Sequence, residues 1–297
     1  MYETLIIFGA ISGAVLALLA LGFTLIYGVA NVVNMAHGTI FMYGAYMFFI
    51  FGPFGTFGLD PVMALILSAI TMAIMGSIVY VIFIHPVMGD EVAGIVSTVC
   101  AALILQQIIF LDPPLGFGGE HKGVPPLVSG STTILGVTVT NSKILAFVVS
   151  LVLIATISIF IAKTKIGRAM KAVSQDREVA MLMGINTPRL YIITIAISSA
   201  LAAVAGILIT GSASPVAEPH MWLTPLMMSF AIVILGGLGS IKGTLIAGFI
   251  VGYVGETVVY FVPEGVFLKG AIALAVMVTV LVIRPKGLFG KRIELED

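Results

Sequence analysis

The sequence predicts an all-α polytopic membrane protein with about eight or nine transmembrane helices, two of which are short or interrupted. Of its 297 residues, 60% are hydrophobic and only 9% are charged, whereas soluble domains carry about 25% charged residues. So few charges could not cover a water-exposed surface, which excludes a soluble enzyme. The 14 basic and 14 acidic residues balance, so the net charge predicts no nucleic-acid partner. The whole chain, 1–297, is expected to form a single transmembrane domain.

Nine apolar runs follow one another along the chain. A membrane-spanning helix needs roughly 20 apolar residues, and seven runs approach that length: residues 5–27, 62–84, 92–111, 144–162, 190–210, 244–262 and 266–283. The other two runs, 39–51 and 225–235, are shorter. Because no Lys or Arg precedes the first run, we expect a retained span there and not a signal peptide. If either short run is re-entrant, the number of crossings changes.

The polar segments differ strongly in charge. Eleven of the 14 Lys and Arg residues lie in 163–189, at Lys242 and in the tail 284–297. The positive-inside rule therefore places these segments in the cytoplasm, with the N-terminus outside and the C-terminus inside. Residues 112–143 become a long extracytoplasmic loop, in which alternating residues around Gly136 predict a small β-hairpin over 132–140.

Residues 163–189 combine basic charge with helical periodicity. On one helix over 167–184, one face carries Ala169, Met170, Val173, Ala180 and Met181, with Arg177 among them. The other face carries Arg168, Lys171, Ser174, Gln175, Glu178 and Leu182. This pattern is typical of an amphipathic helix on the cytoplasmic side. Such a helix either lies flat in the lipid interface or docks into a groove on a partner protein.

Each of the two short apolar runs adjoins a break in the helical pattern. The polar stretch 31–38 precedes the first run, and the glycine-rich stretch 236–243 follows the second. Broken helices leave backbone groups that lipid cannot bond, so they must line a cavity or pack inside protein. We therefore expect a solute path to be lined by Asn31, Asn34, His37, Gly38, Gly236, Gly237 and Gly239. Helix capping by the asparagines is an equal alternative.

Glu256 is the carboxylate that lies well inside an apolar run. An ionisable residue in a span is a functional candidate by default, so Glu256 joins the predicted path. A position near the outer interface is an equal alternative, because Pro263 follows about two turns later.

The chain carries no recognisable catalytic motif, neither H-E-x-x-H nor G-x-S-x-G. Its four histidines lie in four separate segments and its one cysteine is Cys100, so no metal site is expected. Residues 237–244 approach a Walker A loop, but Lys242 precedes Gly243 and the required order fails. We expect no ATP site and no cofactor in this chain.

Four segments, in order along the chain, resemble those of branched-chain amino acid ABC transporter permeases. They are 22–38, with its Asn-Met-Ala-His-Gly block, 164–186, 236–244 and the tail 284–290. Within the second segment, Glu178, Ala180 and Gly184 reproduce the E-x-A-x-x-x-G spacing of the loop by which ABC importer permeases contact their ATPases. The family's downstream Leu-Pro is absent at its expected distance. The block and the length near 300 residues resemble the LivH-like subunit more than its LivM-like partner.

The resemblance implies a permease subunit of an ATP-driven importer for branched-chain amino acids, which works by alternating access in a bacterial or archaeal inner membrane. The implied partners are a homologous LivM-like permease, two cytoplasmic ATPases that bind the ATP, and an extracytoplasmic amino-acid-binding protein. The coupling segment would contact the ATPases through Gly167, Arg168, Lys171, Glu178, Ala180 and Gly184.

Alternatives remain within and outside this family. Permeases for urea, short amides or other amino acids are similar at the same motifs. An ion-coupled secondary transporter would need a coupling-ion site, for which Glu256 is the candidate.

Overall fold

The computed structural model describes residues 2–113, 116–212, 216–285 and 287–289. Of the predicted basic tail, Lys286, Lys291 and Arg292 lie outside the described residues. The described residues form eleven α-helices and four short strands, which confirms the all-α prediction.

Seven stretches of helix are long and apolar enough to cross a membrane. They are α1 (Tyr2–Ala30), α3 (Pro61–Val79) with its continuation, α4 (Glu91–Phe110), α5 (Asn141–Lys163), α8 (Thr187–Thr210), α10 (Ile241–Phe261) and α11 (Gly265–Ile283). The continuation of α3 is a π-turn, η1 (Tyr80–Ile84), and a 3-10 turn, η2 (His85–Val87). The other two apolar runs form the shorter helices α2 (His37–Phe51) and α9 (Leu223–Gly236).

Local sequence explains where most helices begin. Short polar side chains accept hydrogen bonds from first-turn N–H groups, which would otherwise lack partners. Pro61 and Pro188 follow two of these caps, at positions where a missing N–H costs nothing. The capped helices are α3 (Asp60), α4 (Asp90), α6 (Thr164), α7 (Asp176), α8 (Asn186) and α10 (Ser240).

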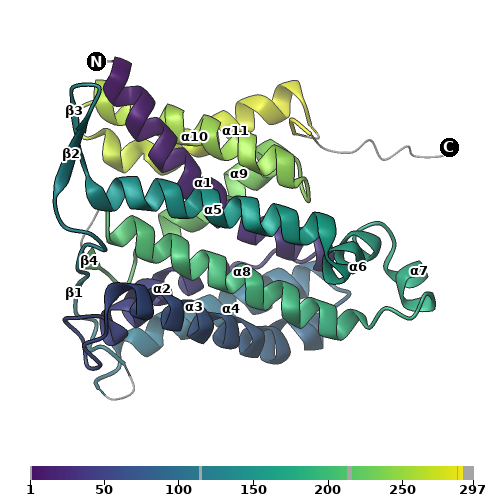
Figure 1. Cartoon of the computed structure of the whole chain (residues 1–297). Helices are drawn as coiled ribbons and strands as arrows, with labels where there is room; N and C mark the ends of the chain where they lie inside the picture. The colour runs from purple at the N-terminus through teal and green to yellow at the C-terminus, as the bar shows by residue number, and fades with distance from the viewer. Residues whose placement is uncertain (1, 114–115, 213–215, 286, 290–297) are drawn as a thin grey trace.

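The two ends of the bundle differ in what they carry (Figure 1). One end, here called the hairpin end, holds the strand pairs β2 (Ser131–Ile134) with β3 (Val137–Thr140) and β1 (Lys122–Gly123) with β4 (Val216–Ala217). The first pair is the predicted hairpin. The opposite end, here called the α6–α7 end, carries α6 (Lys165–Val173) and α7 (Arg177–Leu182).

The predicted continuous helix over 167–184 is instead two helices. The chain leaves α6 at Ser174 and restarts at Asp176, which adopts an extended conformation and caps α7 through a bond from the Val179 amide. The apolar periodicity continues past Asp176, but the cap that Asp176 provides starts a new helix there. The buried face keeps Met170, Val173 and Ala180, but Met181 is exposed.

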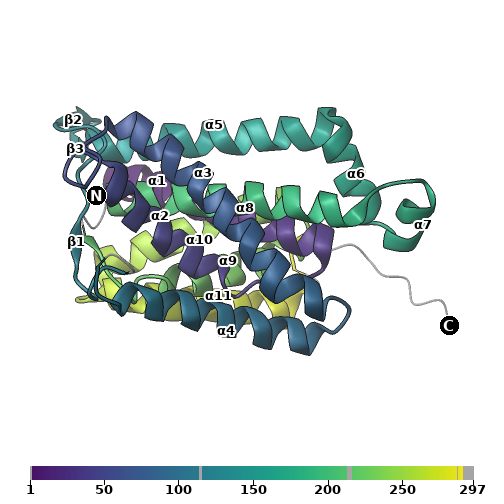
Figure 2. The same cartoon turned by 90° about the horizontal axis from the view of Figure 1, so that it is seen from below.

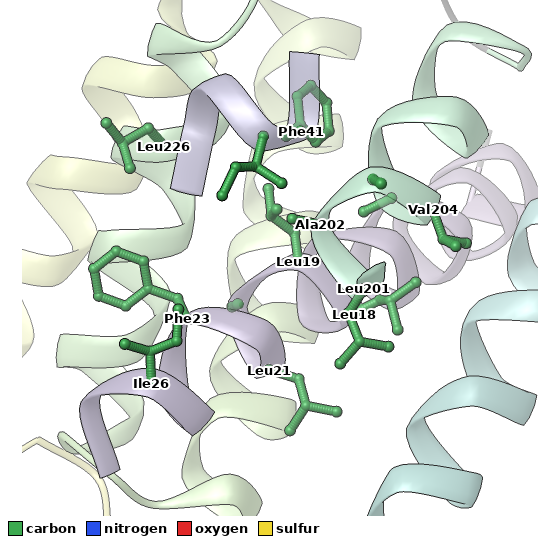
Figure 3. Close-up of a cluster of buried hydrophobic side chains, with 14 of the residues drawn as sticks. Leu18, Leu19, Leu21, Phe23, Ile26, Phe41, Leu201, Ala202, Val204 and Leu226 are labelled. Carbon is green, nitrogen blue, oxygen red and sulfur yellow. The ribbon is translucent and has the colours of Figure 1, made fainter. Parts of the chain in front are cut away.

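The core lies where α1 and α8 cross in the middle of the bundle (Figure 3). Side chains of α1, α2, α8 and α9 fill it, among them Leu19, Phe23, Phe41, Ala202 and Leu226. Around this centre, α10 packs along α1 and α3 packs along α8. Figure 2 shows α3, α4 and α5 towards the outside of the bundle.

The two short helices begin in the middle of the bundle and run to opposite ends. His37, at the start of α2, is level with Leu19 in the middle of α1, and a Cβ on Gly38 would lie 2.7 Å from the carbonyl oxygen of Trp222 at the start of α9. From there α2 reaches the hairpin end and α9 the α6–α7 end. Thus α1–α2–α3 and α8–α9–α10 form two copies of opposite direction, an arrangement typical of transporters.

This symmetry changes which segments correspond. The counterpart of the break before α2 is the connection that leads from α8 into α9, and not 236–243 as the sequence suggested. Within 236–243, residues 237–240 form a tight turn between α9 and α10, where Gly237 and Gly239 adopt positive φ angles of 100° and 78°. A glycine cluster indicates a turn, but its depth depends on how the helices pack.

The close contact between α2 and α8 should require glycine at position 44. A Cβ on Gly44 would lie 2.5 Å from the Cα of Ala203, so we expect Gly44→Ala to destabilise the protein by about 1–3 kcal/mol through overpacking. Gly94→Ala is the matched control, because it is also helical but a Cβ there meets nothing within 4 Å. Thermal unfolding in detergent measures both. Equal melting temperatures for the two variants would contradict this packing.

Candidate functional site

The break before α2 places a histidine at the crossing of three helices. The His37 side chain is fully buried, and its Nε2 donates a hydrogen bond to the Leu19 carbonyl oxygen at 3.1 Å. The ring meets Phe23 edge-on, with centroids 5.6 Å apart. A Cβ on Gly22 would come 3.0 Å from the imidazole. Glycine at this position of α1 therefore makes room for the ring.

The extended backbone of the break finds its partners on α4 and within itself. The Asn34 Oδ1 accepts a hydrogen bond from the Ala36 amide at 3.1 Å. The Thr98 Oγ1 lies 3.2 Å from both the Met35 amide nitrogen and the Val33 carbonyl oxygen. These side chains satisfy backbone groups that a helix would have bonded internally.

Two polar atoms at the break keep free hydrogen-bonding capacity. The Asn34 Nδ2, a donor, and the His37 Nδ1, an acceptor while Nε2 holds the proton, are buried and have no partner within the described residues. Buried polar atoms normally have partners. The N-terminal ends of α2 and α9, which carry partial positive charge, meet at the same depth. Among the described residues, the centre thus offers neutral polar groups and helix ends, and no fixed charge.

The structure divides the predicted path residues among three places. Asn34, His37 and Gly38 lie in the centre. At the α6–α7 end are Asn31, Gly236, Gly237 and Gly239. Glu256 lies towards the hairpin end, where its Oε1 accepts from Lys269 Nζ at 2.7 Å and from Ser12 Oγ at 2.6 Å. The polar contacts of Glu256 join α1, α10 and α11.

In the segment 164–186, which the resemblance predicts to contact the ATPases, packing and backbone conformation explain three of the motif residues. Gly167 is buried against the backbone of Ile161, and Ala180 is the buried residue of α7. Gly184 adopts a φ of 83° and ends α7 with bonds from Gly184 N to Met181 O and from Ile185 N to Ala180 O. This is a Schellman ending, which favours glycine at that position. Arg168, Lys171 and Glu178 are exposed.

Sequence reasoning missed two features of the α6–α7 end. Leu182 and Met183, at the tip of α7, are 86% and 79% exposed, although the helical pattern had placed Leu182 among polar residues without assigning it a role. A cavity of about 410 Å³ also lies between the end of α1, the start of α4 and the α6–α7 connection. Its lining includes Asn31, Glu91, Arg177 and Tyr191, which no single sequence motif brings together.

Comparisons with known proteins agree with this architecture. A family model described as the permease component of the branched-chain amino acid transport system matches residues 5–281. The chain is 30% identical to the high-affinity branched-chain amino acid transport system permease protein BraD of Pseudomonas aeruginosa, over 95% of this chain and 94% of that protein. It is 30% identical to LivH of Salmonella typhimurium, with the same coverage. A probable LivH of Methanocaldococcus jannaschii is also 30% identical, over 97% of this chain and 93% of that protein.

Among solved structures, PsaBC from Streptococcus pneumoniae in complex with Fab matches with a TM-score of 0.51. The match covers 94% of this chain and 91% of that chain at 12% identity, so it supports the fold alone. The family model and the full-length relatives together carry the assignment: this chain belongs to the family of permease components of branched-chain amino acid transport systems.

Proposed function

We propose that this chain is a membrane-spanning permease subunit of an ATP-driven importer for branched-chain amino acids. It would move solute by alternating access, together with a LivM-like permease, two cytoplasmic ATPases and an extracytoplasmic binding protein. It would itself bind no ATP and no cofactor. Relatives that match nearly its whole length are named for branched-chain amino acid transport, and this supports the substrate class.

The observation that carries the ATP-driven mechanism is the tip of α7. Leu182 and Met183 project from the α6–α7 end with large exposed apolar surface. They lie inside the segment that bears Glu178, Ala180 and Gly184. Apolar side chains at the tip of a protruding segment suit a groove on a partner, and an ATPase is the partner that an importer requires.

The proposed orientation follows from charge. Residues 163–189, Lys242 and Arg284 gather at the α6–α7 end, whereas Lys122, Lys143 and Lys269 lie towards the hairpin end. The positive-inside rule favours a cytoplasmic α6–α7 end, with the N-terminus outside and the C-terminus inside.

The proposed solute path passes the break before α2. A branched-chain amino acid has an apolar side chain and opposite charges at one end. Neutral groups such as Asn34 Nδ2 and His37 Nδ1 can bond to it without holding it as tightly as a fixed charge would. Both residues are buried, so the path would be closed here and would open as the bundle rearranges. A partner ATPase can drive that change only if ATP binding favours one arrangement over the other.

Reconstituted uptake tests the function directly. Proteoliposomes would hold this chain, its partner permease and the ATPases, with ATP inside and the binding protein outside. We expect ATP-dependent accumulation of radiolabelled leucine that is lost when this chain is omitted. If the binding protein stimulates ATP hydrolysis but no leucine is taken up, leucine is the wrong substrate. This result would favour urea, amides or other amino acids as the solute. Accumulation that ignores ATP but follows an ion gradient would favour a secondary transporter with Glu256.

A substitution can remove the Asn34 Nδ2 donor and keep an oxygen that bonds to the Ala36 amide. Serine at position 34 keeps an oxygen for the Ala36 amide but lacks the Nδ2 donor. We expect Asn34→Ser to lower leucine uptake about tenfold, the effect of one lost hydrogen bond of about 1.4 kcal/mol, at unchanged complex yield. Asn141→Ser, an asparagine in the structure's hairpin end, should leave uptake unchanged. Normal uptake by Asn34→Ser would remove Asn34 from the path.

The coupling role of Gly184 can be tested through its backbone conformation. A Cβ there would meet nothing within 4 Å, so the positive φ is what limits an alanine at this position. Alanine in that conformation costs about 1–2 kcal/mol, whereas asparagine adopts it more readily. We expect Gly184→Ala to reduce ATPase co-purification and coupled uptake severalfold, and Gly184→Asn to retain most of both. Identical behaviour of the two variants would show that the ending of α7 does not matter for coupling.

A further inference from the structure

The cavity at the α6–α7 end has charged groups of opposite sign in its wall. Asp90 and Glu91, at the start of α4, contribute carboxylates, and Arg177, at the start of α7, contributes a guanidinium. Among the described residues no ion pair joins these groups. The guanidinium carbon of Arg177 lies 5.7 Å from the centroid of the Tyr191 ring. The Asp90 carboxylate accepts a hydrogen bond from the Ala93 amide. The cavity therefore holds apart charges that a ligand carrying both signs could bridge.

The end of α1 adds partial negative charge to the cavity wall that also carries the Asp90 and Glu91 carboxylates. Asn31 ends the helix with a φ of 52°, and its amide bonds to the Tyr27 carbonyl. The last carbonyl groups of a helix lack partners within it and carry partial negative charge. Residues 28–30 line the cavity, so these carbonyls and the Glu91 carboxylate would both favour an ammonium group.

The wall also carries aliphatic side chains. Ile84, Val87 and Val173 are among the lining residues, and they could receive an aliphatic side chain. A volume of about 410 Å³ falls within the range of roughly 300–1,000 Å³ that small-molecule sites occupy.

We propose that this cavity binds a zwitterionic amino acid with an aliphatic side chain, on the cytoplasmic side, as solute leaves the permease. Arg177 receives the carboxylate. Glu91 and the carbonyl end of α1 receive the ammonium group. This inference rests on the proposed function for its ligand, but it concerns residues that neither the predicted path nor the coupling motif includes, apart from Asn31.

Equilibrium binding tests the site. Labelled leucine is added to the purified permease–ATPase complex without the binding protein, and Glu91→Gln and Arg177→Gln are compared with the parent. We expect each variant to raise the Kd about tenfold or more, the usual effect of losing a charge-assisted hydrogen bond. Arg189→Gln is the matched control, because Arg189 is exposed at the same end outside the cavity wall, and its Kd should equal that of the parent.

Ligand analogues separate recognition from a structural effect. The amine 3-methylbutylamine lacks the carboxylate and should bind the parent at least tenfold more weakly than leucine. In Arg177→Gln the two ligands should bind alike. A Kd that neither Glu91→Gln nor Arg177→Gln changes would overturn the site, as would equal discrimination in parent and Arg177→Gln.

The uptake assay distinguishes failure of the site from failure of the function. If the reconstituted system imports leucine but the complex shows no leucine binding sensitive to Glu91 or Arg177, the cavity proposal alone is wrong. This outcome would fit a cavity filled by an ATPase side chain. If the system imports no leucine, the proposed substrate is wrong and the ligand assigned to the cavity is overturned with it.

Discussion

The structure depends on one constraint, which is that backbone N–H and C=O groups inside an apolar environment must find partners within the protein. The break before α2 can exist only because Thr98 and Asn34 bond to its backbone and because α1 and α8 enclose it. An extended segment at this depth would be too costly on the lipid-facing surface. The constraint therefore explains why the polar residues of the break lie in the centre of the bundle.

Enclosing the break requires helices that approach closely. Gly248 of α10 contacts Ala17 of α1, where a Cβ would lie 2.7 Å from the Ala17 Cα, and Gly76 of α3 lies against the Ser199 side chain of α8. The helices thus form two tightly packed pairs, α1 with α10 and α3 with α8. Because the pairs occupy corresponding positions in the two inverted copies, the start of α2 and the start of α9 both lie at the junction between them.

Hydrophobic pattern and charge predicted the nine helices, the hairpin and the separation of basic residues, since each depends on local sequence. The break at Asp176 was missed because one capping side chain outweighs a continuing apolar pattern. The depth of 236–243 was missed because it depends on packing against Gly28. Of the site, the sequence predicted Asn34 and His37, but it could not predict a cavity whose wall joins Glu91, Arg177 and Tyr191 from three separate helices.

The α6–α7 end contacts both helix pairs, through α1 and through α8. Arg177 of α7 lies over the Tyr191 ring of α8, which meets Tyr80 edge-on at a centroid distance of 6.4 Å, at the end of α3. A displacement of α7 would therefore reach the α3–α8 pair through direct contacts. The end of α1 lies across the cavity from α7, and α1 also contacts α6 directly. A ligand that fills the cavity would add a connection between α7 and the α1–α10 pair. Occupancy of the cavity and movement of the coupling segment would then be linked, and by the reciprocity of linked equilibria each would change the free energy of the other.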